Sequence, residues 1–158
     1  MDEERSVEAY IGMDKTSEKA LNWYKDSFLR GDISEGLSWK WSWWAFFGNW
    51  LYLLYRKCYK EGIIYFFIIN IIGKSIGRFL PELTKSISGL SLFIGILSGG
   101  LLHNIIYRRY KNTKKILEES LESEDELKKG LEKNGGTDRK AVIIGIVAYF
   151  LINKILSL

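Results

Sequence analysis

His103 is the side chain in this sequence that is best suited to proton transfer, and it is the single histidine among 158 residues. It stands beside Asn104 near the end of a long apolar run, where an ionisable group can serve as a proton relay or a ligand. The alternative is a structural hydrogen bond to a neighbouring helix. The pattern contains no second histidine, no cysteine pair and no carboxylate within the apolar runs. We therefore expect a non-enzyme without catalytic residues, metal or cofactor, and keep His103 as a candidate functional polar residue.

Two other motifs invite chemical interpretation. The single cysteine, Cys58, excludes an intramolecular disulfide and any cysteine-based metal cluster. It could be acylated beside a membrane-surface helix, or simply pack as an apolar side chain. The sequence "GGT" at 135–137 lacks the preceding strand and the following Lys-Ser/Thr pair of a phosphate-binding loop. It predicts instead the end of one helix and a cap at Thr137 for the next.

Small residues recur every four positions in two apolar segments. Such spacing places them on one helix face, where they allow another backbone to approach closely. The faces could form a homo-oligomer interface, or the two segments could pack on each other within one chain. The predicted helix-packing residues are Ser91, Gly95 and Gly99 in one segment and Gly73 and Gly77 in the other.

The segment 39–57, which begins WKWSWWAFFGNW, concentrates five of the chain's 6 tryptophans ahead of a basic cluster. Indole prefers the boundary between lipid and water, and basic residues attract anionic headgroups. We therefore predict an interfacial helix over 39–57. Its expected anchoring residues at the membrane interface are Trp39, Trp41, Trp43, Trp44, Trp50, Arg56 and Lys57.

Elements on either side of this helix are predicted from apolar periodicity and length. We expect one membrane domain over 1–158, all-α, with a transmembrane hairpin and a C-terminal span. Residues 1–13 read as a loosely packed start, and a helix at 16–30 completes a cytoplasmic region over 1–38. The hairpin comprises 62–80 and 86–107, a cytoplasmic amphipathic helix follows over 108–136, and the last span covers 140–157. The absence of a signal peptide and the positions of lysine and arginine predict a cytoplasmic N-terminus.

Several stretches together resemble a small bacterial inner-membrane family, the domain of unknown function 2628. They are "AYIG" at 9–12, "WSWWAFFGNWLYLLYRKCY" at 41–59, "IIYRRYKNTKKI" at 105–116 and "GGT" at 135–137. The chain departs from the family at Asn49, where proline often precedes the tryptophan, and at Cys58, where methionine is usual. The resemblance implies a multi-pass protein of the bacterial inner membrane with no agreed activity.

The functional expectation follows from plentiful amphipathic surface and scarce catalytic chemistry. A net charge of +4 is too small to indicate a nucleic-acid partner. We expect a membrane-anchored adaptor or scaffold whose partners are the lipid bilayer and an unidentified protein. The alternatives are a small oligomeric channel or transporter subunit, in which the chain forms a homo-oligomer, and a lipid-modifying enzyme that depends on His103.

Overall fold

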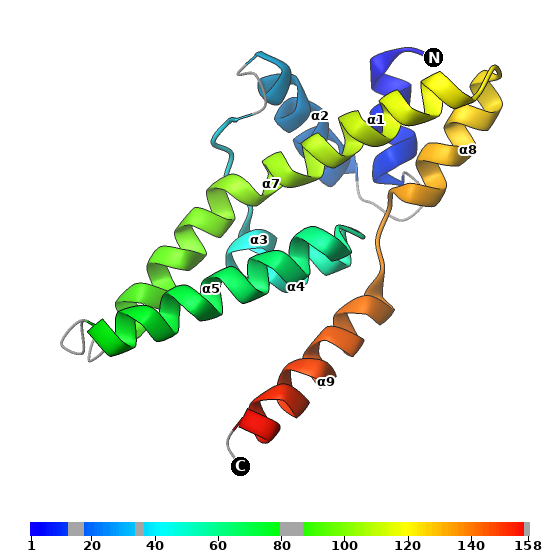
Figure 1. Cartoon of the computed structure of the whole chain (residues 1–158). Helices are drawn as coiled ribbons and strands as arrows, with labels where there is room; N and C mark the ends of the chain where they lie inside the picture. The colour runs from blue at the N-terminus through cyan, green and yellow to red at the C-terminus, as the bar shows by residue number, and fades with distance from the viewer. Residues whose placement is uncertain (13–17, 34–36, 80–86, 157–158) are drawn as a thin grey trace.

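The computed structural model describes residues 1–12, 18–33, 37–79 and 87–156, and within these ranges it contains helices and no strand. The prediction of an all-α chain agrees with this. Figure 1 shows α5 and α7 converging at one end, with α3 and α4 beside them, while α1, α2 and α8 surround the other end of α7. In chain order the helices are α1 (Glu3–Ile11), α2 (Glu18–Ile33), α3 (Trp43–Gly48), α4 (Trp50–Tyr55), α5 (Tyr59–Phe79), α7 (Ile87–Ser120), α8 (Glu124–Asn134) and α9 (Arg139–Leu156).

The predicted membrane architecture was wrong. Within the described ranges, no helix combines the length and the apolar character that crossing a membrane requires. In α5 the charge-free run covers only 62–73, about 18 Å of helix against a hydrocarbon core of about 30 Å. In α9 it covers 141–153, about 20 Å. The transmembrane hairpin 62–80/86–107, the span 140–157 and the multi-pass inner-membrane localisation are therefore corrected.

The predicted boundary between an apolar helix ending at 107 and a charged helix starting at 108 does not exist. The single helix α7 runs through both segments for 34 residues, about 51 Å. The change from apolar to charged side chains leaves the backbone pattern intact, because Arg108, Arg109 and Lys111 are good helix formers. After α7 the chain turns, and α8 begins with Ser123 at the N-cap position.

Residues 3–11 form the well-packed helix α1, where we predicted a loosely packed start. Asp2 caps α1 by accepting a hydrogen bond from the Arg5 amide at 2.8 Å, and Gly12 ends the helix with a positive φ of 84°. Tyr10 and Ile11 are completely buried. The ring of Tyr10 packs 5.3 Å from that of Tyr110 in α7, so α1 supplies part of the hydrophobic core.

The tryptophan-rich segment is also not one helix over 39–57. Residues 37–42 have no regular secondary structure, and two six-residue helices, α3 and α4, follow. The break falls at Asn49, whose φ of 47° and ψ of −124° lie outside the helical region. Ser42 caps α3 by accepting from the Ala45 amide at 3.3 Å.

The ends of two other predicted helices also differ. The helix predicted over 16–30 is observed as α2, which continues to Ile33, and the expected caps at Thr16 and Ser17 lie outside the described residues. The helix stop at "GGT" is confirmed, because Gly135 follows the last residue of α8. The next helix is capped by Asp138 and not by Thr137, since the Asp138 carboxylate accepts from the Ala141 amide at 3.0 Å.

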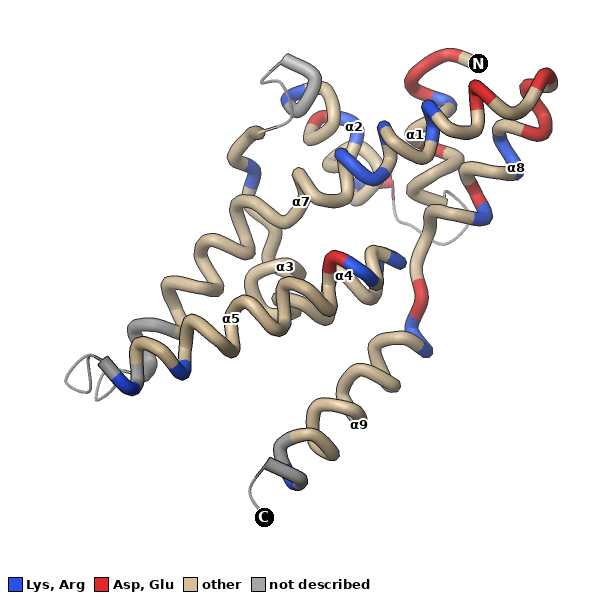
Figure 2. Tube along the Cα trace, viewed as in Figure 1, with Lys and Arg blue, Asp and Glu red and all other residues tan. Residues whose placement is uncertain are grey.

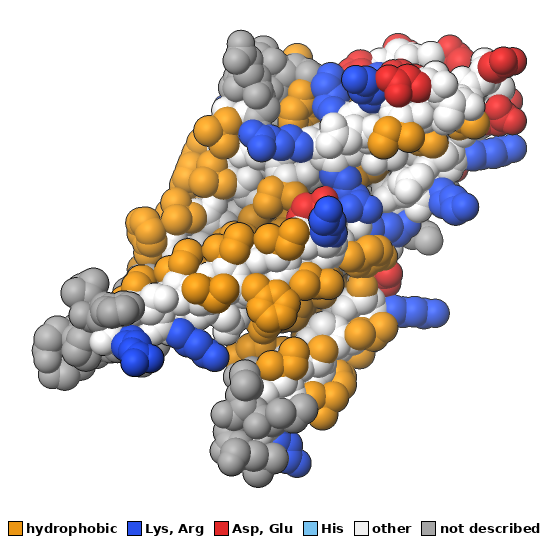
Figure 3. Space-filling model, in the orientation of Figure 1, with side chains coloured by type: hydrophobic (Ala, Val, Ile, Leu, Met, Phe, Trp, Pro, Cys, Tyr) orange, Lys and Arg blue, Asp and Glu red, His pale blue; other side chains and the backbone are white. Residues whose placement is uncertain are grey.

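Charged and apolar residues are segregated along the molecule. Figure 2 shows acidic residues gathered at the start of the chain and around the turn between α7 and α8. In α5 and α9 the charged residues lie toward the helix ends. Figure 3 shows apolar side chains over α5 and α9 in the same view. The molecule therefore has one polar end and one end with a large apolar surface.

Candidate binding surfaces

The most extensive candidate surface consists of apolar side chains on α5 and α9. On each helix the spacing matches the α-helical period, so the side chains share one face. All are between 46% and 67% exposed. We call this surface the α5–α9 apolar face; it comprises Ile64, Phe67, Ile68, Ile71, Ile143, Ile144, Val147, Phe150 and Leu151.

Helix α4 holds the two helices of this face together. It packs on both α5 and α9, and its residues Leu53 and Leu54 are buried. Gly145 permits the close approach of α9, because a Cβ there would lie 2.7 Å from a methyl group of Leu54. The rings of Phe66 in α5 and Tyr149 in α9 pack edge to face at 6.1 Å. The apolar side chains are thus presented from a packed scaffold.

A second site lies where residues 37–42 cross α7. The Lys40 amide donates to the Gly100 carbonyl at 3.1 Å, and the Ser42 amide donates to the Gly99 carbonyl at 2.8 Å. Glycine is required at position 100 for this approach, because a Cβ there would lie 2.4 Å from the Trp39 ring. The Asn104 side chain adds a hydrogen bond to each backbone group of Ser38, at 3.0 and 2.8 Å.

His103 belongs to the same crossing. Its Nε2 lies 3.0 Å from the Ser38 hydroxyl, and its ring packs edge to face on Trp23. The side chain is 1% exposed. Burial, together with the positive charge of Lys40, lowers the pKa of His103 to about 4. The imidazole is therefore neutral at physiological pH.

The Ser38–His103 pair has the contact expected of a nucleophile and its base. Among the described residues no carboxylate is hydrogen-bonded to Nδ1 of His103, where the orienting group of such a dyad would lie. The Ser38 hydroxyl instead approaches the Asn104 side-chain oxygen at 3.3 Å. The contacts of Ser38 with His103 and Asn104 therefore form a set of hydrogen bonds that attaches residues 37–42 to α7.

The predicted helix-packing glycines of α7 contact the aromatic segment and not α5. Gly95 and Gly99 pack against Phe46, and Gly99 also contacts Trp41. In α5, Gly73 has open space where its side chain would be. Ser91 is exposed in α7, while the surroundings of Gly77 fall outside what the structure describes. The close contacts at Gly95 and Gly99 are those of packing within one chain.

The five tryptophans predicted as interface anchors are placed differently from one another. Trp43 and Trp44 are 62% and 82% exposed, and Trp39 is half exposed above Gly100. Trp41 packs on α7 through Gly99. The Trp50 ring contacts the Phe66 ring at 4.8 Å. Only part of the set therefore faces outward.

The basic cluster after the tryptophans is partly internal. Arg56 is 3% exposed, and its guanidinium carbon lies 4.7 Å from the centroid of the Tyr24 ring. Its Nε and Nη2 have no hydrogen-bond partner among the described residues. Lys57 donates to the Lys133 carbonyl at 3.0 Å, which places its charge at the negative end of the α8 dipole. Both residues have structural contacts that the sequence pattern did not indicate.

Cys58 is completely buried. Its thiol donates to the Arg56 carbonyl over 3.6 Å, and burial raises the pKa of the thiol to about 12. A buried, protonated thiol is a poor nucleophile. The position agrees with the apolar role that we considered for this residue.

We predict that Arg56→Met has little effect on stability. Burial of a guanidinium with two unpaired N–H groups is costly, and methionine of similar length can fill the same space. The expected free energy of unfolding lies within about 1 kcal/mol of the wild-type value. In Arg56→Ala the packing of the side chain is also lost, and we expect a decrease of about 2 kcal/mol. Chemical denaturation gives the free energy of unfolding of the two variants. Equal losses of stability in Arg56→Met and Arg56→Ala would show that the charge of Arg56 is itself stabilising.

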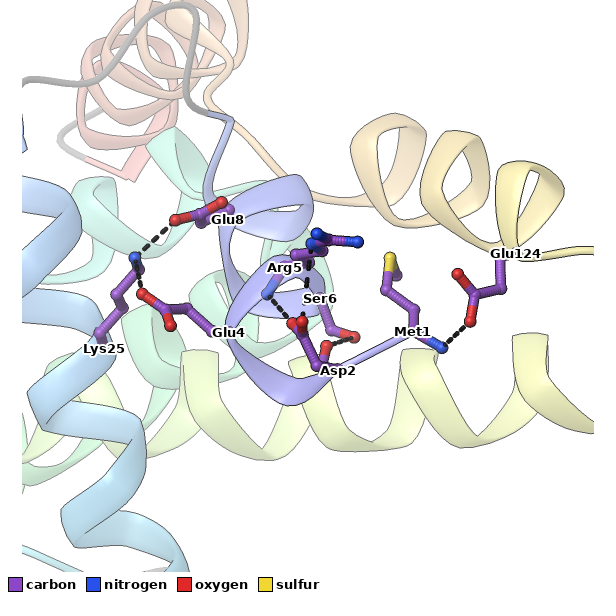
Figure 4. Close-up of polar contacts among 8 residues, drawn as sticks. All are labelled: Met1, Asp2, Glu4, Arg5, Ser6, Glu8, Lys25 and Glu124. Carbon is purple, nitrogen blue, oxygen red and sulfur yellow. Dashed lines mark hydrogen bonds and ion pairs between the residues drawn. The ribbon is translucent and has the colours of Figure 1, made fainter.

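A polar network joins α1 to α2 and α8 (Figure 4). Lys25 donates to Glu4 at 2.6 Å and to Glu8 at 2.5 Å, and the amino group of Met1 pairs with Glu124 at 2.5 Å. Between α1 and α8 lies a hollow of about 690 Å³ with charged residues of both signs in its wall. Most of these ion pairs are exposed, so each contributes little to stability.

The described residues thus define a small all-helical protein with an apolar face at one end and a charged hollow at the other. The chain belongs to the family described as "Protein of unknown function (DUF2628)", whose model matches residues 13–111. The match covers α2 to α5 and most of α7. No curated protein and no solved structure proved similar to the chain.

Proposed function

We propose that this protein is a non-enzymatic adaptor that binds a helical segment of a protein partner on the α5–α9 apolar face. The observation that carries the proposal is the exposure of nine large apolar side chains at helical spacing. Each of these side chains leaves about half of its surface uncovered. Exposed apolar patches of this extent mark interaction sites.

The charges around this face indicate the chemistry of the partner. Lys60 and Lys74 stand toward the two ends of α5, and Arg139 and Lys140 begin α9; all four are exposed. The one acidic residue at the start of α5, Glu61, already pairs with Arg109 at 3.2 Å. An apolar helix flanked by acidic residues would complement both features.

A pair of peptides tests this chemistry directly. One is an amphipathic helix of about 20 residues with a leucine face and glutamates at both ends, and the other carries lysines in place of the glutamates. At low salt we expect the glutamate peptide to bind at least about tenfold more tightly in calorimetric titrations, because only its ends attract the basic residues.

Two variants locate the binding. Ile71 in α5 and Leu37, ahead of α3, are both 63% exposed, so glutamate substitutions at these positions are matched in chemistry and exposure. Ile71→Glu should weaken peptide binding about tenfold or more, while Leu37→Glu should leave it unchanged. Equal binding by both variants, or by both peptides, would contradict the proposal.

The same preparation distinguishes other occupants. Sedimentation of the protein alone shows whether a second copy covers the face, in which case the Ile71→Glu variant is monomeric and the wild type is not. Mixing with anionic phospholipid vesicles shows whether a lipid surface competes for it. Self-association or vesicle uptake that abolishes peptide binding would replace the protein partner as the occupant.

A further inference from the structure

A hollow of about 550 Å³ lies among α5, α7 and the junction of α3 and α4. Its volume falls within the range of small-molecule sites. Trp50, Phe66 and Ile94 supply apolar walls from three separate elements. Gly73 in α5 also lines it, and a Cβ built there would meet nothing within 4 Å. None of the nine apolar side chains that define the α5–α9 apolar face lines the hollow, although Lys74 borders both.

The polar side chains in the lining of the hollow are those of Asn49, Asn70, Lys74, Ser91 and Tyr149. Asn49 lines it from the helix junction, and its side-chain oxygen is buried without a hydrogen-bond partner. The Asn70 amide is already engaged, because it donates to the Phe66 carbonyl at 2.8 Å. Lys74 is exposed at the lining and has no ion pair among the described residues. The wall therefore offers one acceptor without a donor and one cation without an anion.

We propose that this hollow binds an amphiphilic anion that also carries a hydroxyl or N–H group. Its apolar chain would lie against Trp50 and Phe66, and the transfer of that chain out of water would favour binding. The hydroxyl or N–H group would donate to the Asn49 oxygen, which removes the cost of an unpaired buried acceptor. The anionic group would pair with Lys74. This combination excludes cationic amphiphiles and disfavours molecules without a donor.

Three probes, used below their micelle concentrations, test the ligand class by isothermal titration calorimetry. They are 3-hydroxydecanoate, decanoate and decyltrimethylammonium. We expect 3-hydroxydecanoate to bind most tightly, decanoate about three- to tenfold more weakly because it lacks the donor, and the cation at least about tenfold more weakly again. Equal affinities for the anions and the cation would show unspecific adhesion to apolar surface and would overturn the proposal.

Matched variants of α5 locate the site. Gly73→Leu should fill the hollow and reduce 3-hydroxydecanoate binding at least about tenfold, whereas Ser75→Leu adds the same side chain at an exposed position outside the lining and should have no effect. Lys74→Met should weaken the binding of the two anionic probes and leave the binding of the cationic probe unchanged. Arg78→Met, which removes a nearby positive charge outside the lining, is its control and should have no effect. Circular dichroism verifies that each variant is folded. Unchanged binding in both Gly73→Leu and Lys74→Met would place the ligand elsewhere and refute the site.

Discussion

Gly135→Ala is expected to destabilise the protein by about 3 kcal/mol, the largest effect that we predict for a single methyl group. A Cβ at this position would lie 1.9 Å from the carbonyl oxygen of Tyr10 and 2.6 Å from its carbonyl carbon. Both contacts are with backbone atoms, so no rotation of a side chain can relieve them. The end of α8 must move away from α1, and the core around Tyr10 opens with it.

The same displacement removes a hydrogen bond. The Gly136 amide donates to the Tyr10 carbonyl at 2.7 Å in the observed packing. Hydrogen exchange at the Gly136 amide should therefore be slow in the wild type and fast in Gly135→Ala, and denaturation with urea gives the loss of stability.

Gly73→Ala is the control for this substitution. Gly73 lies within α5 with open space around it, and alanine is a better helix former than glycine. The free energy of unfolding of Gly73→Ala should equal that of the wild type or exceed it by up to about 1 kcal/mol. If Gly135→Ala stayed within about 0.5 kcal/mol of the wild type, α1 and α8 would not be packed as described.

Acidification from pH 7 to pH 4 should remove about 3 kcal/mol of stability through His103 alone. The folded protein holds the pKa of this imidazole at about 4, below the ordinary value of 6.5, because the ring is buried and Lys40 is near. As the pH falls through 6.5, the unfolded chain binds the proton first. The stability contribution is thus complete above about pH 6.5 and is lost as the pH approaches 4.

His103→Gln isolates this contribution. Glutamine is neutral at every pH and can still hydrogen-bond the Ser38 hydroxyl. Carboxylates such as Asp26, which pairs with Lys40, titrate in both proteins and cancel in the comparison. We expect the free energy of unfolding of the wild type to fall by about 3 kcal/mol more than that of the variant between pH 7 and pH 4. Parallel curves would mean that His103 has an ordinary pKa and is not buried.

The membrane prediction failed for an identifiable reason. In α5 and α9 the charge-free runs, about 18 and 20 Å long, are shorter than the hydrocarbon core. In α7 the chain itself covers residues that we had assigned to contact with lipid or with another membrane helix. The small residues of α7 resemble a lipid-facing interface, but aromatic rings from residues 41–46 cover Gly95 and Gly99. His103 and Asn104, polar residues in the same helix, are buried, and both form hydrogen bonds with Ser38.

The sequence by itself determined the helical content, the stop at Gly135 and the apolar stripes of α5 and α9, because these depend on neighbours within one or two helical turns. Tertiary structure alone decided that Tyr10 and Ile11 join the core, that Arg56 and Cys58 are buried, and that Ser38 meets His103. Each of these depends on contacts between residues distant in the chain. The candidate hollow belongs to the same category: Asn49, Lys74 and Tyr149 come from three different helices or junctions, and only packing brings them together.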